Sequence, residues 1–432
     1  MDRAIEDFVR TLGLDAYLVG GAVRDEQLGL ESKDADFVVP GVDYDGLRRA
    51  LEPHGRVEDL EVADRQVGAR LHPDDPELRR LAPAGIEFAP PRAELSTGPG
   101  RHDFEIVADP SLSIEGDMAR RDFTVNAMAR RLDTGELIDP FGGRADLERG
   151  VLRMVRPNSF AEDPLRLVRG LRLVSHLGLE PEEDTLEHMR AEAGSIRLVS
   201  GERLGDELAK LLQGKEPAKA LRLARDTGVL TALLPEFEPA IGSVDEHIFR
   251  VVQAAADAGA PLAVRLAALF HDLGKPSRNG SHAERSAALA SGALGRLRYP
   301  NRLRAHTTRL VRAHSFPLED VDALFARRFL RDHGGVLAFD LVTHKEADLA
   351  GKRPSEEELA AVTQLRSLLE QERAHPHRLS DLAVDGADLI ALGFEEGPEL
   401  GRILTALLDA VVEDPRANTT ERLLALARDQ RR

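Results

Sequence analysis

Strand-like and helix-like patterns occupy separate parts of this sequence, and that separation limits the folds it can adopt. Within about the first 145 residues, helical patterns alternate with apolar runs typical of strands, at 16–21, 35–39, 84–89 and 103–108. After Pro140 the strand signals disappear, and helical periodicity predicts helices at 163–177, 202–213, 217–227, 247–258, 262–270, 284–297, 302–314 and 356–371. The sequence therefore predicts an α+β fold in which a mixed head precedes an all-helical body.

The length and the changes in pattern predict the domain organisation. A chain of 432 residues suggests about three domains at roughly 150 residues each. The pattern changes divide it into a head at 1–145, a helical neck at 146–215, a helical body at 216–370 and a helical tail at 371–432. The segment QERAHPHRLS at the start of the tail has the composition of a hinge.

The composition excludes several kinds of chemistry. The sequence has no cysteine, which rules out disulfides, zinc–thiolate sites, iron–sulfur clusters and thiol nucleophiles, and leaves His, Asp and Glu as metal ligands. No apolar run reaches the roughly 18 residues of a membrane span, and the N-terminus MDRAIEDFVR is too acidic for a secretory signal. We therefore expect a soluble cytoplasmic protein without a membrane partner.

Charge is distributed unevenly along the chain. A net charge of −17 argues against a protein that coats nucleic acid non-specifically. Between Ser286 and Leu318, however, there is no acidic residue, and the stretch contains Arg296, Arg298, Arg302, Arg304, Arg309 and Arg312. This run favours contact with a polyanion over the alternative, which is a solvated helix face.

Two features near the N-terminus suggest phosphate and metal binding. Gly20 and Gly21 lie between a strand pattern and a helix pattern that contains Arg24, an arrangement that lets a backbone approach a phosphate, although a tight turn is the simpler interpretation. Asp34 and Asp36 start an apolar strand two residues apart, so both face the same side. A shared Mg²⁺ would stabilise such a pair and also bind substrate phosphates. Together the two features predict metal-dependent nucleotidyl transfer.

These motifs, and three that follow them, resemble a known family. Residues 20–25 (GGAVRD) with 34–36 (DAD), 120–128 (RRDFTVNAM), 138–143 (IDPFGG) and 162–172 (EDPLRLVRGLR) resemble class II tRNA nucleotidyltransferases and bacterial poly(A) polymerases. The resemblance implies a polymerase-β-like head with a small mixed sheet, followed by an elongated helical neck, body and tail. It also implies template-independent addition of CCA to tRNA from CTP and ATP, with Mg²⁺ held by Asp34 and Asp36 as the catalytic residues.

The helix predicted at 163–177 has a side rich in arginine. Pro164 fits its first position and makes Asp163 the natural N-cap. Arg166, Arg169 and Arg172 recur every three residues, so we expect them on one side of the helix without acidic partners. The resemblance implies that Asp163 and Arg166 read the base of the incoming nucleotide. It implies contact with the rest of the nucleotide for Gly20, Gly21, Arg24, Arg121, Asp122, Asn126, Arg169 and Arg172.

Two further features of the head are predicted less sharply. Glu87 lies on a strand that could neighbour the strand of Asp36, and is either a third metal carboxylate or an exposed strand residue. Residues 92–102 (RAELSTGPGRH) have the composition of a mobile loop, in which Arg92 and Glu94 match the start of the family's flexible loop. Presence of that loop favours complete CCA addition over addition of CC alone. We find no extra basic, aromatic segment of the poly(A) polymerase kind between Val38 and Ile86.

Histidines in the body suggest a second metal site. His271 and Asp272 are adjacent, His247 precedes them and Asp348 follows, an order that resembles the HD phosphohydrolase superfamily. His282 and His314 match further positions of HD-bearing tRNA nucleotidyltransferases and could complete a binuclear site for Mg²⁺, Mn²⁺ or Ni²⁺. The alternative is a degenerate HD fold that serves as RNA-binding scaffold. For His306, His333 and His344 we expect only structural roles.

Three classes of function remain in competition. The leading one is a CTP/ATP:tRNA nucleotidyltransferase that contacts the acceptor end and elbow of tRNA, with Arg296, Arg298, Arg302 and Arg304 as RNA-binding candidates. The second is an HD phosphohydrolase whose head only senses nucleotides. The intact DAD motif argues against it, because a sensor needs no pair of metal carboxylates. The third, a non-catalytic RNA-binding module, fits poorly with the charge of −17.

Overall fold

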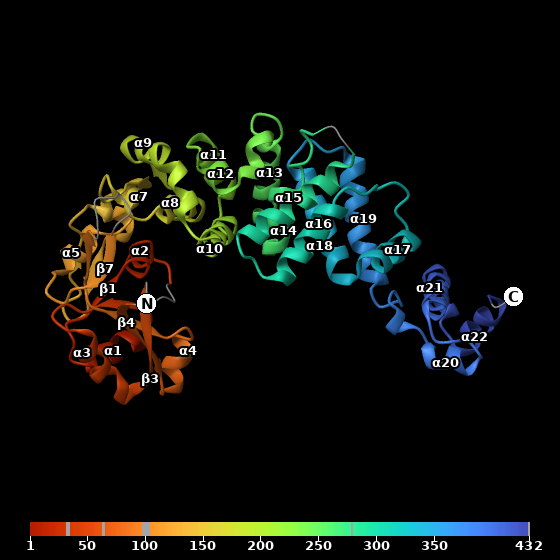
Figure 1. The fold of residues 1–432 in the computed structure, drawn as a ribbon, viewed down its shortest axis with the longest axis horizontal. Helices are drawn as coiled ribbons and strands as arrows, with labels where there is room; N and C mark the ends of the chain where they lie inside the picture. Colours follow the sequence, from red (N-terminus) through yellow and green to blue (C-terminus); the bar gives the residue numbers. More distant parts are fainter. Residues whose placement is uncertain (32–34, 63–64, 97–103, 278–279, 431–432) are drawn as a thin grey trace. The chain divides into compact units, whose positions relative to one another are not determined.

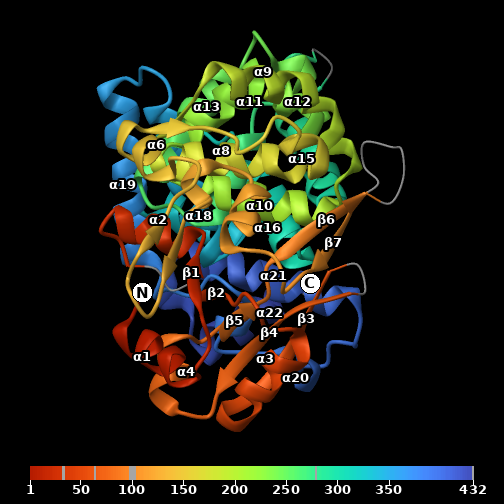
Figure 2. The ribbon, with the colours of Figure 1, turned by 90° about the vertical axis from the view of Figure 1, so that its left-hand side faces the viewer.

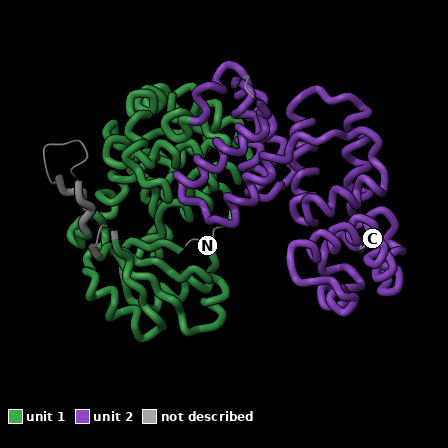
Figure 3. Tube along the Cα trace, turned by 45° about the vertical axis from the view of Figure 1, so that its right-hand side comes forward, with its two compact units in different colours: residues 1–235 green, residues 236–432 purple. Residues whose placement is uncertain are grey.

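The computed structural model describes the chain except for residues 32–34, 63–64, 97–103, 278–279 and 431–432 (Figure 1). It divides into two compact units, residues 1–235 and residues 236–432 (Figure 3). No helix in the described part of the chain combines the length and apolarity needed to cross a membrane.

A mixed sheet of seven strands forms the core of the head. In spatial order its strands are β3 (Gly55–Val62), β4 (Arg65–Pro73), β5 (Ile86–Ala89), β2 (Asp36–Val38), β1 (Tyr17–Val19), β8 (Ala129–Arg131) and β9 (Leu137–Ile138), most of which are labelled in Figure 2. β2 and β5 pair in parallel and the other neighbours are antiparallel. Phe37 and Phe88 stack between β2 and β5 with ring centroids 5.5 Å apart and are buried. The parallel pair therefore anchors the centre of the sheet.

Short helices and a separate hairpin complete the head. The helices are α1 (Arg3–Thr11), α2 (Gly21–Gln27), α3 (Tyr44–Leu51), α4 (Pro76–Leu81), α5 (Ile114–Ala119) and α6 (Gly143–Arg149). The hairpin pairs β6 (Arg92–Ser96) with β7 (Phe104–Ala108). Three of the four predicted strand runs are β1, β2 and β5, and the fourth is β7. The long strands β3 and β4 were not predicted, because charged side chains interrupt their apolar residues.

After the head, the first unit contains α7 (Ser159–Glu162), α8 (Leu165–Leu177), α9 (Glu183–Glu192), α10 (Gly201–Leu212), α11 (Pro217–Asp226) and α12 (Val229–Leu233), of which α11 and α12 lie beyond the predicted neck at 146–215. The expectation that strands end at Pro140 is wrong in one detail, because β10 (Val151–Leu152) pairs in parallel with β11 (Glu180–Pro181). α11 is tied to the end of α8. Lys219 Nζ donates to Gly178 O at 2.6 Å, and the Glu216 amide donates to Ser175 O at 2.8 Å. These bonds help to explain why residues 216–235 belong to the first unit.

All the regular secondary structure among the described residues of the second unit is helical. It comprises α13 (Asp245–Asp257), α14 (Leu262–Phe270), α15 (His282–Arg296), α16 (Asn301–Ala313), α17 (Ala323–His333), α18 (Gly335–Ala350), α19 (Glu356–Glu372), α20 (Gly386–Ala391), α21 (Pro398–Glu413) and α22 (Thr420–Asp429). The last three helices enclose a small apolar core of their own that includes Leu389, Leu407 and Leu423. Arg327 of α17 donates to Val412 O at 2.6 Å and thereby connects this core to the preceding helices.

Candidate functional site

One cavity of about 750 Å³ in the first unit gathers the described head residues that the sequence singles out. Its lining includes Gly20, Gly21, Arg24, Asp36, Glu87, Arg92, Arg121, Asp122, Asn126, Asp163, Arg166, Arg169 and Arg172. Asp34 lies outside the described residues. The sheet, the loop around residues 120–126 and helix α8 thus contribute to a single site.

The turn after β1 needs glycine at its first position. Gly20 has a φ of 71° and a ψ of −130°, a backbone conformation that L side chains rarely adopt. A Cβ there would lie 2.7 Å from Arg121 Nη1. Arg24, one turn into α2, donates to Asn126 Oδ1 at 2.6 Å and to Asp25 Oδ1 at 2.7 Å. The turn therefore brings backbone close to one arginine and fixes a second at the cavity wall.

The carboxylates of the sheet lie side by side. Asp36 is the first residue of β2, and its partner in the parallel register is Glu87 of β5. Both line the cavity, as expected if the strand of Glu87 neighbours the strand of Asp36. Arg70 of β4, opposite Glu87, donates to Glu87 Oε1 at 3.1 and 2.5 Å. Glu87 is therefore an ion-paired residue beside the proposed Mg²⁺ ligand, and not simply an exposed strand glutamate.

Asp117 holds two arginines that line the cavity, and we did not predict its role. Its carboxylate is buried and forms ion pairs of 3.0 Å with both Arg120 and Arg121. It also accepts from the backbone N–H of Arg92 at 3.2 Å. Burial acts to raise the pKa of Asp117, but the two guanidinium groups outweigh it and hold the pKa below its usual value. The spacing of an acid four residues before Arg121 was a usable signal.

The prediction that the arginines of α8 lack acidic partners is wrong. Arg166 Nη1 lies 3.1 Å from Glu162, Arg169 Nε 2.9 Å from Asp122, and Arg172 Nε 3.1 Å from Glu207. Arg166 also donates to Arg120 O at 2.7 Å and to Ser159. Partners from the loop at 122 and from α10 are far from α8 in sequence and could not be assigned by helical spacing. The arginines are consequently held in fixed positions before any ligand binds.

The two aspartates near α8 differ in exposure. Asp122 is buried and receives hydrogen bonds from the Phe123 amide and from Asn126 Nδ2. Burial acts to raise the pKa of Asp122, but the Arg169 cation and the hydrogen bond from the Asn126 amide outweigh burial, so the pKa lies below its usual value. This geometry makes Asp122 a support for Arg169 and Asn126.

Asp163 is open to a ligand, with 30% of its side chain exposed, and pairs with Arg203 at 3.0 Å. Its Oδ1 accepts from the Leu165 amide at 3.2 Å. The prediction that Pro164 occupies the first helical position is one residue off, because α8 begins at Leu165 and Pro164 is the cap residue. Asp163 nevertheless satisfies an N-terminal amide of α8 with its side chain.

The segment predicted as a mobile loop is partly a strand. Residues 92–96 form β6, in which Glu94 pairs with Ile106 of β7, while residues 97–102 lie outside the described part. The side chain of Glu94 is likewise not described. Arg92 is half-buried at the cavity wall, and desolvation together with the Arg120 cation lowers the pKa of Arg92 to about 10. It remains positively charged at neutral pH and adds to the cationic wall of the cavity.

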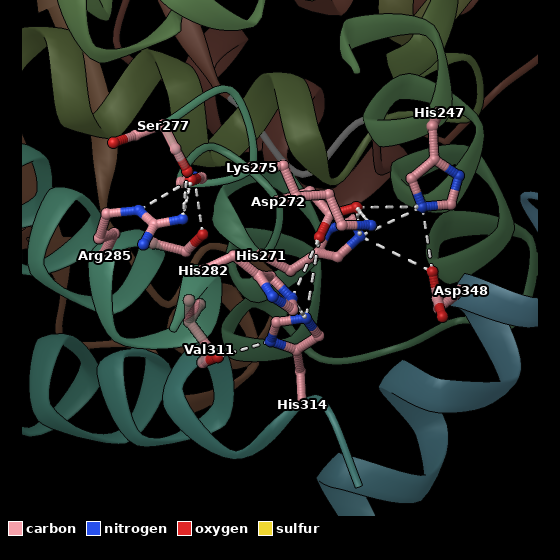
Figure 4. A network of polar contacts seen from close by, with 12 residues as sticks. His247, His271, Asp272, Lys275, Ser277, His282, Arg285, Val311, His314 and Asp348 are labelled. Carbon is pink, nitrogen blue, oxygen red and sulfur yellow. Dashed lines mark hydrogen bonds and ion pairs between the residues drawn. The ribbon is translucent and has the colours of Figure 1, made fainter. Parts of the chain in front are cut away.

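In the second unit, all six predicted metal-binding residues converge (Figure 4). His247 of α13, His271 at the end of α14 and Asp348 of α18 form one triad, and Asp272, His282 and His314 form the other. Within each triad the ligand atoms lie within 4.8 Å of one another. Asp272 also connects the second triad to the first. Its Oδ2 is 3.2 Å from His271 Nε2 of the first triad, and its Oδ1 is 3.8 Å from His314 Nε2 of its own triad.

The ionisation states of these residues suit metal ligation. Burial lowers the pKa of His282, and burial with the nearby His271 lowers the pKa of His314 to about 4. Burial acts to raise the pKa of Asp272, but His271 and Lys275 outweigh it and hold the pKa far below its usual value. The pKa of Asp348 is also far below its usual value, because the His247 hydrogen bond outweighs burial. Neutral imidazoles and ionised carboxylates are the forms that bind divalent cations.

Unsatisfied polar atoms show that the residues fit a metal. Asp272 Oδ1 is buried, and no hydrogen-bond donor among the described residues reaches it. Such an oxygen is stabilised by a cation between it and the two histidines that it faces. We predicted only a structural role for His344, yet it is buried beside the cluster. Its ring lies 5.1 Å from that of His271 and 5.8 Å from that of His314.

The basic stretch at 286–318 is less unbalanced than its sequence indicates. Arg296 pairs with Glu236 at 2.8 Å and Arg312 pairs with Glu284 at 3.0 Å, so acidic residues outside the stretch neutralise two of its arginines. Arg298 and Arg302 are exposed where α15 ends and α16 begins, and Arg304 is half-buried. The surface available to a polyanion is therefore smaller than the sequence suggests.

Matches to known domain families cover most of the chain. Residues 16–153 match the poly A polymerase head domain, and residues 178–241 match an RNA and SrmB- binding site of polymerase A. Residues 244–362 match the HD domain, and residues 349–427 match domain 2 of tRNA nucleotidyltransferase. The head and HD families depend on divalent metal ions.

Several curated proteins and solved structures are similar to the whole chain or to much of it. A multifunctional CCA protein of Neisseria gonorrhoeae is 41% identical over 61% of this chain, and the match spans 62% of that relative's length. A multifunctional CCA protein of Chromobacterium violaceum is 35% identical over 78% of this chain and 88% of its own length. The structure of the Bacillus stearothermophilus CCA-adding enzyme in complex with CTP has a TM-score of 0.74 and 25% identity. The match between the two structures covers 99% of this chain and 96% of the Bacillus chain.

The Chromobacterium relative and a relative from Thioalkalivibrio carry the same name, and both match this chain over more than two thirds of their own length. The multifunctional CCA protein of Thioalkalivibrio sulfidiphilus is 37% identical over 70% of this chain and 75% of its own length. The mixed sheet is that of a polymerase-β-like head, and the helices after it have the expected order. The chain belongs to the family of class II CCA-adding enzymes that carry an HD domain.

Proposed function

We propose that the head of this protein adds CCA to the 3′ ends of tRNA from CTP and ATP without a nucleic-acid template. One observation carries the proposal: a single cavity combines the metal-binding strand of Asp36 with a wall of positioned arginines and the accessible carboxylate of Asp163. The relatives named multifunctional CCA proteins and the CTP complex of a similar enzyme support it.

The two aspartates of the DAD motif would hold the cation. Asp34 and Asp36 are the proposed Mg²⁺ ligands, and the carboxylate of Glu87 beside Asp36 fits a hard cation in the same place. Bound there, Mg²⁺ supplies charge stabilisation to the transferring phosphoryl group. Arg70 competes for Glu87 through their ion pair, which makes Glu87 a weaker ligand than the aspartates.

The arginines of the cavity bind the triphosphate and support the choice of base. Arg24, Arg121, Arg169 and Arg172 present guanidinium groups whose charge suits phosphates, and each is held by an acidic or amide partner. Asp163 supplies an acceptor and Arg166 a set of donors, a combination that matches the edge of a base. Glu162 and the Arg120 carbonyl fix the orientation of Arg166, so selectivity depends on a rigid side chain.

The tRNA would be bound by parts of the chain beyond the cavity. The match of residues 178–241 to an RNA-binding family and the tRNA complex of the similar Thermotoga maritima enzyme support a tRNA partner. Arg298 and Arg302, which are exposed, are better candidates for RNA contact than Arg296, which is paired with Glu236. A tRNA substrate supports the proposal that the enzyme acts in the cytoplasm.

Incorporation of labelled nucleotides tests the proposal against its two closest alternatives. A tRNA that lacks its 3′ CCA is offered CTP, ATP, UTP and GTP singly and together with Mg²⁺. We expect two additions with CTP alone and three with CTP plus ATP. Two additions under both conditions would identify an enzyme that adds only CC, and long A tails would identify a poly(A) polymerase.

The two triads favour a second activity, metal-dependent phosphoester hydrolysis at the HD site. A divalent cation there, such as Mg²⁺, Mn²⁺ or Ni²⁺, polarises phosphoryl oxygens and lowers the pKa of bound water. We expect hydrolysis of 2′,3′-cyclic phosphates or small phosphomonoesters when a transition metal is added. Absence of hydrolysis with every divalent ion, together with absence of bound metal in the second unit, would support the scaffold alternative.

A further inference from the structure

His344 packs against both triads of the HD site although no motif points to it. It is one turn before Asp348 on α18, so both side chains project from the same side of the helix. Its ring contacts His271 of one triad with an interplanar angle of 72° and His314 of the other with an angle of 63°. His344 is therefore the neighbour of a candidate ligand from each triad.

The imidazole of His344 has no hydrogen-bond partner in the part of the chain that the structure describes. The side chain is 1% exposed, and neither Nδ1 nor Nε2 has a donor or acceptor among the described residues. The contrast with its neighbours is informative, because His271 and His314 each use Nδ1 to contact a backbone carbonyl, at 2.8 and 2.7 Å. Buried polar side chains are rarely left unsatisfied, so an orphan of this kind requires a partner that the polypeptide does not supply.

We propose that His344 is a seventh metal-binding residue of the HD site. The partner missing from its imidazole is the divalent cation cluster that the two triads hold, and His344 binds within that cluster from the α18 side. Asp272 is the second group of the site with a buried atom, Oδ1, that lacks a hydrogen bond among the described residues, and this oxygen faces His314, which is also a neighbour of His344. Both orphans therefore adjoin the second triad and are satisfied together when metal binds.

The proposal makes two predictions of opposite sign for one variant. In the metal-free protein His344 is an unsatisfied buried group, so His344→Leu should raise the unfolding temperature measured with EDTA present. In the loaded protein the same change removes a ligand, so the dissociation constant for Mn²⁺ should rise at least tenfold. A residue that only fills space, or that bonds a trapped water, would not combine these two effects.

Mn²⁺ binding followed by electron paramagnetic resonance on the full chain tests the proposal. Asp36→Asn is present in every protein compared, so that binding at the head does not obscure the HD site. His306→Gln is the matched control. The Nε2 atom of His306 lies 2.7 Å from Asp340 Oδ2, and His306 belongs to neither triad, so this variant should leave Mn²⁺ affinity unchanged. His344→Gln is the second variant, used if the leucine variant does not fold.

The outcomes separate this inference from the proposal on which it rests, that the triads bind metal. Mn²⁺ affinity equal to that of the parent in a folded His344 variant would overturn the role of His344 and leave the triads intact. A parent protein that binds no Mn²⁺ outside the head would overturn both. A weakened Mn²⁺ site in a variant that melts no lower than the parent with EDTA would confirm the inference.

Discussion

The head cavity and the HD site differ in the charge of their side chains and in whether those side chains already have hydrogen-bond partners. The head cavity is lined by arginines whose guanidinium groups are held by acidic residues and carbonyls, so it is organised to receive an anion. The HD site joins imidazoles, two of which (His282 and His314) have a lowered pKa, to ionised carboxylates. Two of its buried groups find no hydrogen-bond partner among the described residues, so the site is organised to receive cations.

The difference shows what each site gains from its ligand. Arg166 and Arg169 already have partners, and a nucleotide must share them, which favours selectivity over raw affinity. In the HD site, Asp272 Oδ1 and His344 gain their first partner when metal binds, which favours affinity. The head is thus expected to tolerate the absence of its ligand better than the HD site does.

Removal of the described metal carboxylate should have the largest effect on the head. Asp36→Asn keeps the size of the side chain but loses the charge, and we expect CMP addition to fall by about 1000-fold or more because Mg²⁺ serves the chemical step. Binding of tRNA, measured by filter retention, should stay near that of the parent. Asp45→Asn, an exposed residue of α3, is the control. An equal loss of tRNA binding would show that Asp36 is structural.

Removal of the carboxylate that holds the cavity arginines should affect stability. Asp117→Asn leaves Arg120 and Arg121 partly buried without their shared partner, so we expect a loss of about 3 kcal/mol in the free energy of unfolding. Urea unfolding measures it. Asp74→Asn, which breaks an exposed pair of 3.9 Å with Arg79, should change the same quantity by less than about 0.5 kcal/mol. An equally small change in both variants would mean that the ion pairs of Asp117 do not stabilise the fold.

The stability of the second unit should fall as the pH falls below about 6.5. Unfolded His314 takes up a proton near pH 6.5, whereas the folded residue does so only near pH 4, so the unfolded state binds more protons in between. At pH 5 this linkage is worth about 2 kcal/mol. Chemical unfolding with a chelator present should show the loss, and His314→Gln should reduce it. His188→Gln, a partly exposed histidine of α9, should leave the pH dependence unchanged.

Selectivity among nucleotides should show the smallest effect. Arg166→Lys keeps the charge but loses the planar fork, so we expect the preference for CTP and ATP over UTP and GTP to fall by about tenfold. Arg169→Lys should instead raise KM for all four nucleotides without changing their order. Ratios of kcat/KM in single-nucleotide assays distinguish the two. Unchanged ratios for Arg166→Lys would refute its role in base reading.

Helices with one apolar face were the easiest elements to predict. The eight predicted helices lie within two residues of α8, α10, α11, α13, α14, α15, α16 and α19 at each end. α18 was not predicted, because buried residues such as Leu337, Val342 and His344 surround it and leave no polar face to set the period. That helix carries Asp348, which only the order of the HD motif indicated, and His344, for which we predicted only a structural role.

In the candidate sites too, local motifs were predictable from the sequence, whereas contacts between distant segments were not. Local motifs led to the glycine turn, Asp36 and α8, and the cavity brings them together. The pairing of Arg169 with Asp122 and of Arg172 with Glu207 depends on tertiary contacts between distant segments and has no local signal. His247 and Asp348 are 101 residues apart and lie 3.0 Å from each other, a contact that only the order of the HD motif indicated.

The central claim is that the chain holds two independent sites, and one variant tests it most directly. His271→Ala combined with Asp272→Ala removes a ligand from each triad. The account predicts that this protein binds no metal in the second unit and hydrolyses no phosphoester, yet adds CCA to tRNA within twofold of the parent rate. Loss of CCA addition in the double variant, with circular dichroism showing an intact fold, would contradict the account.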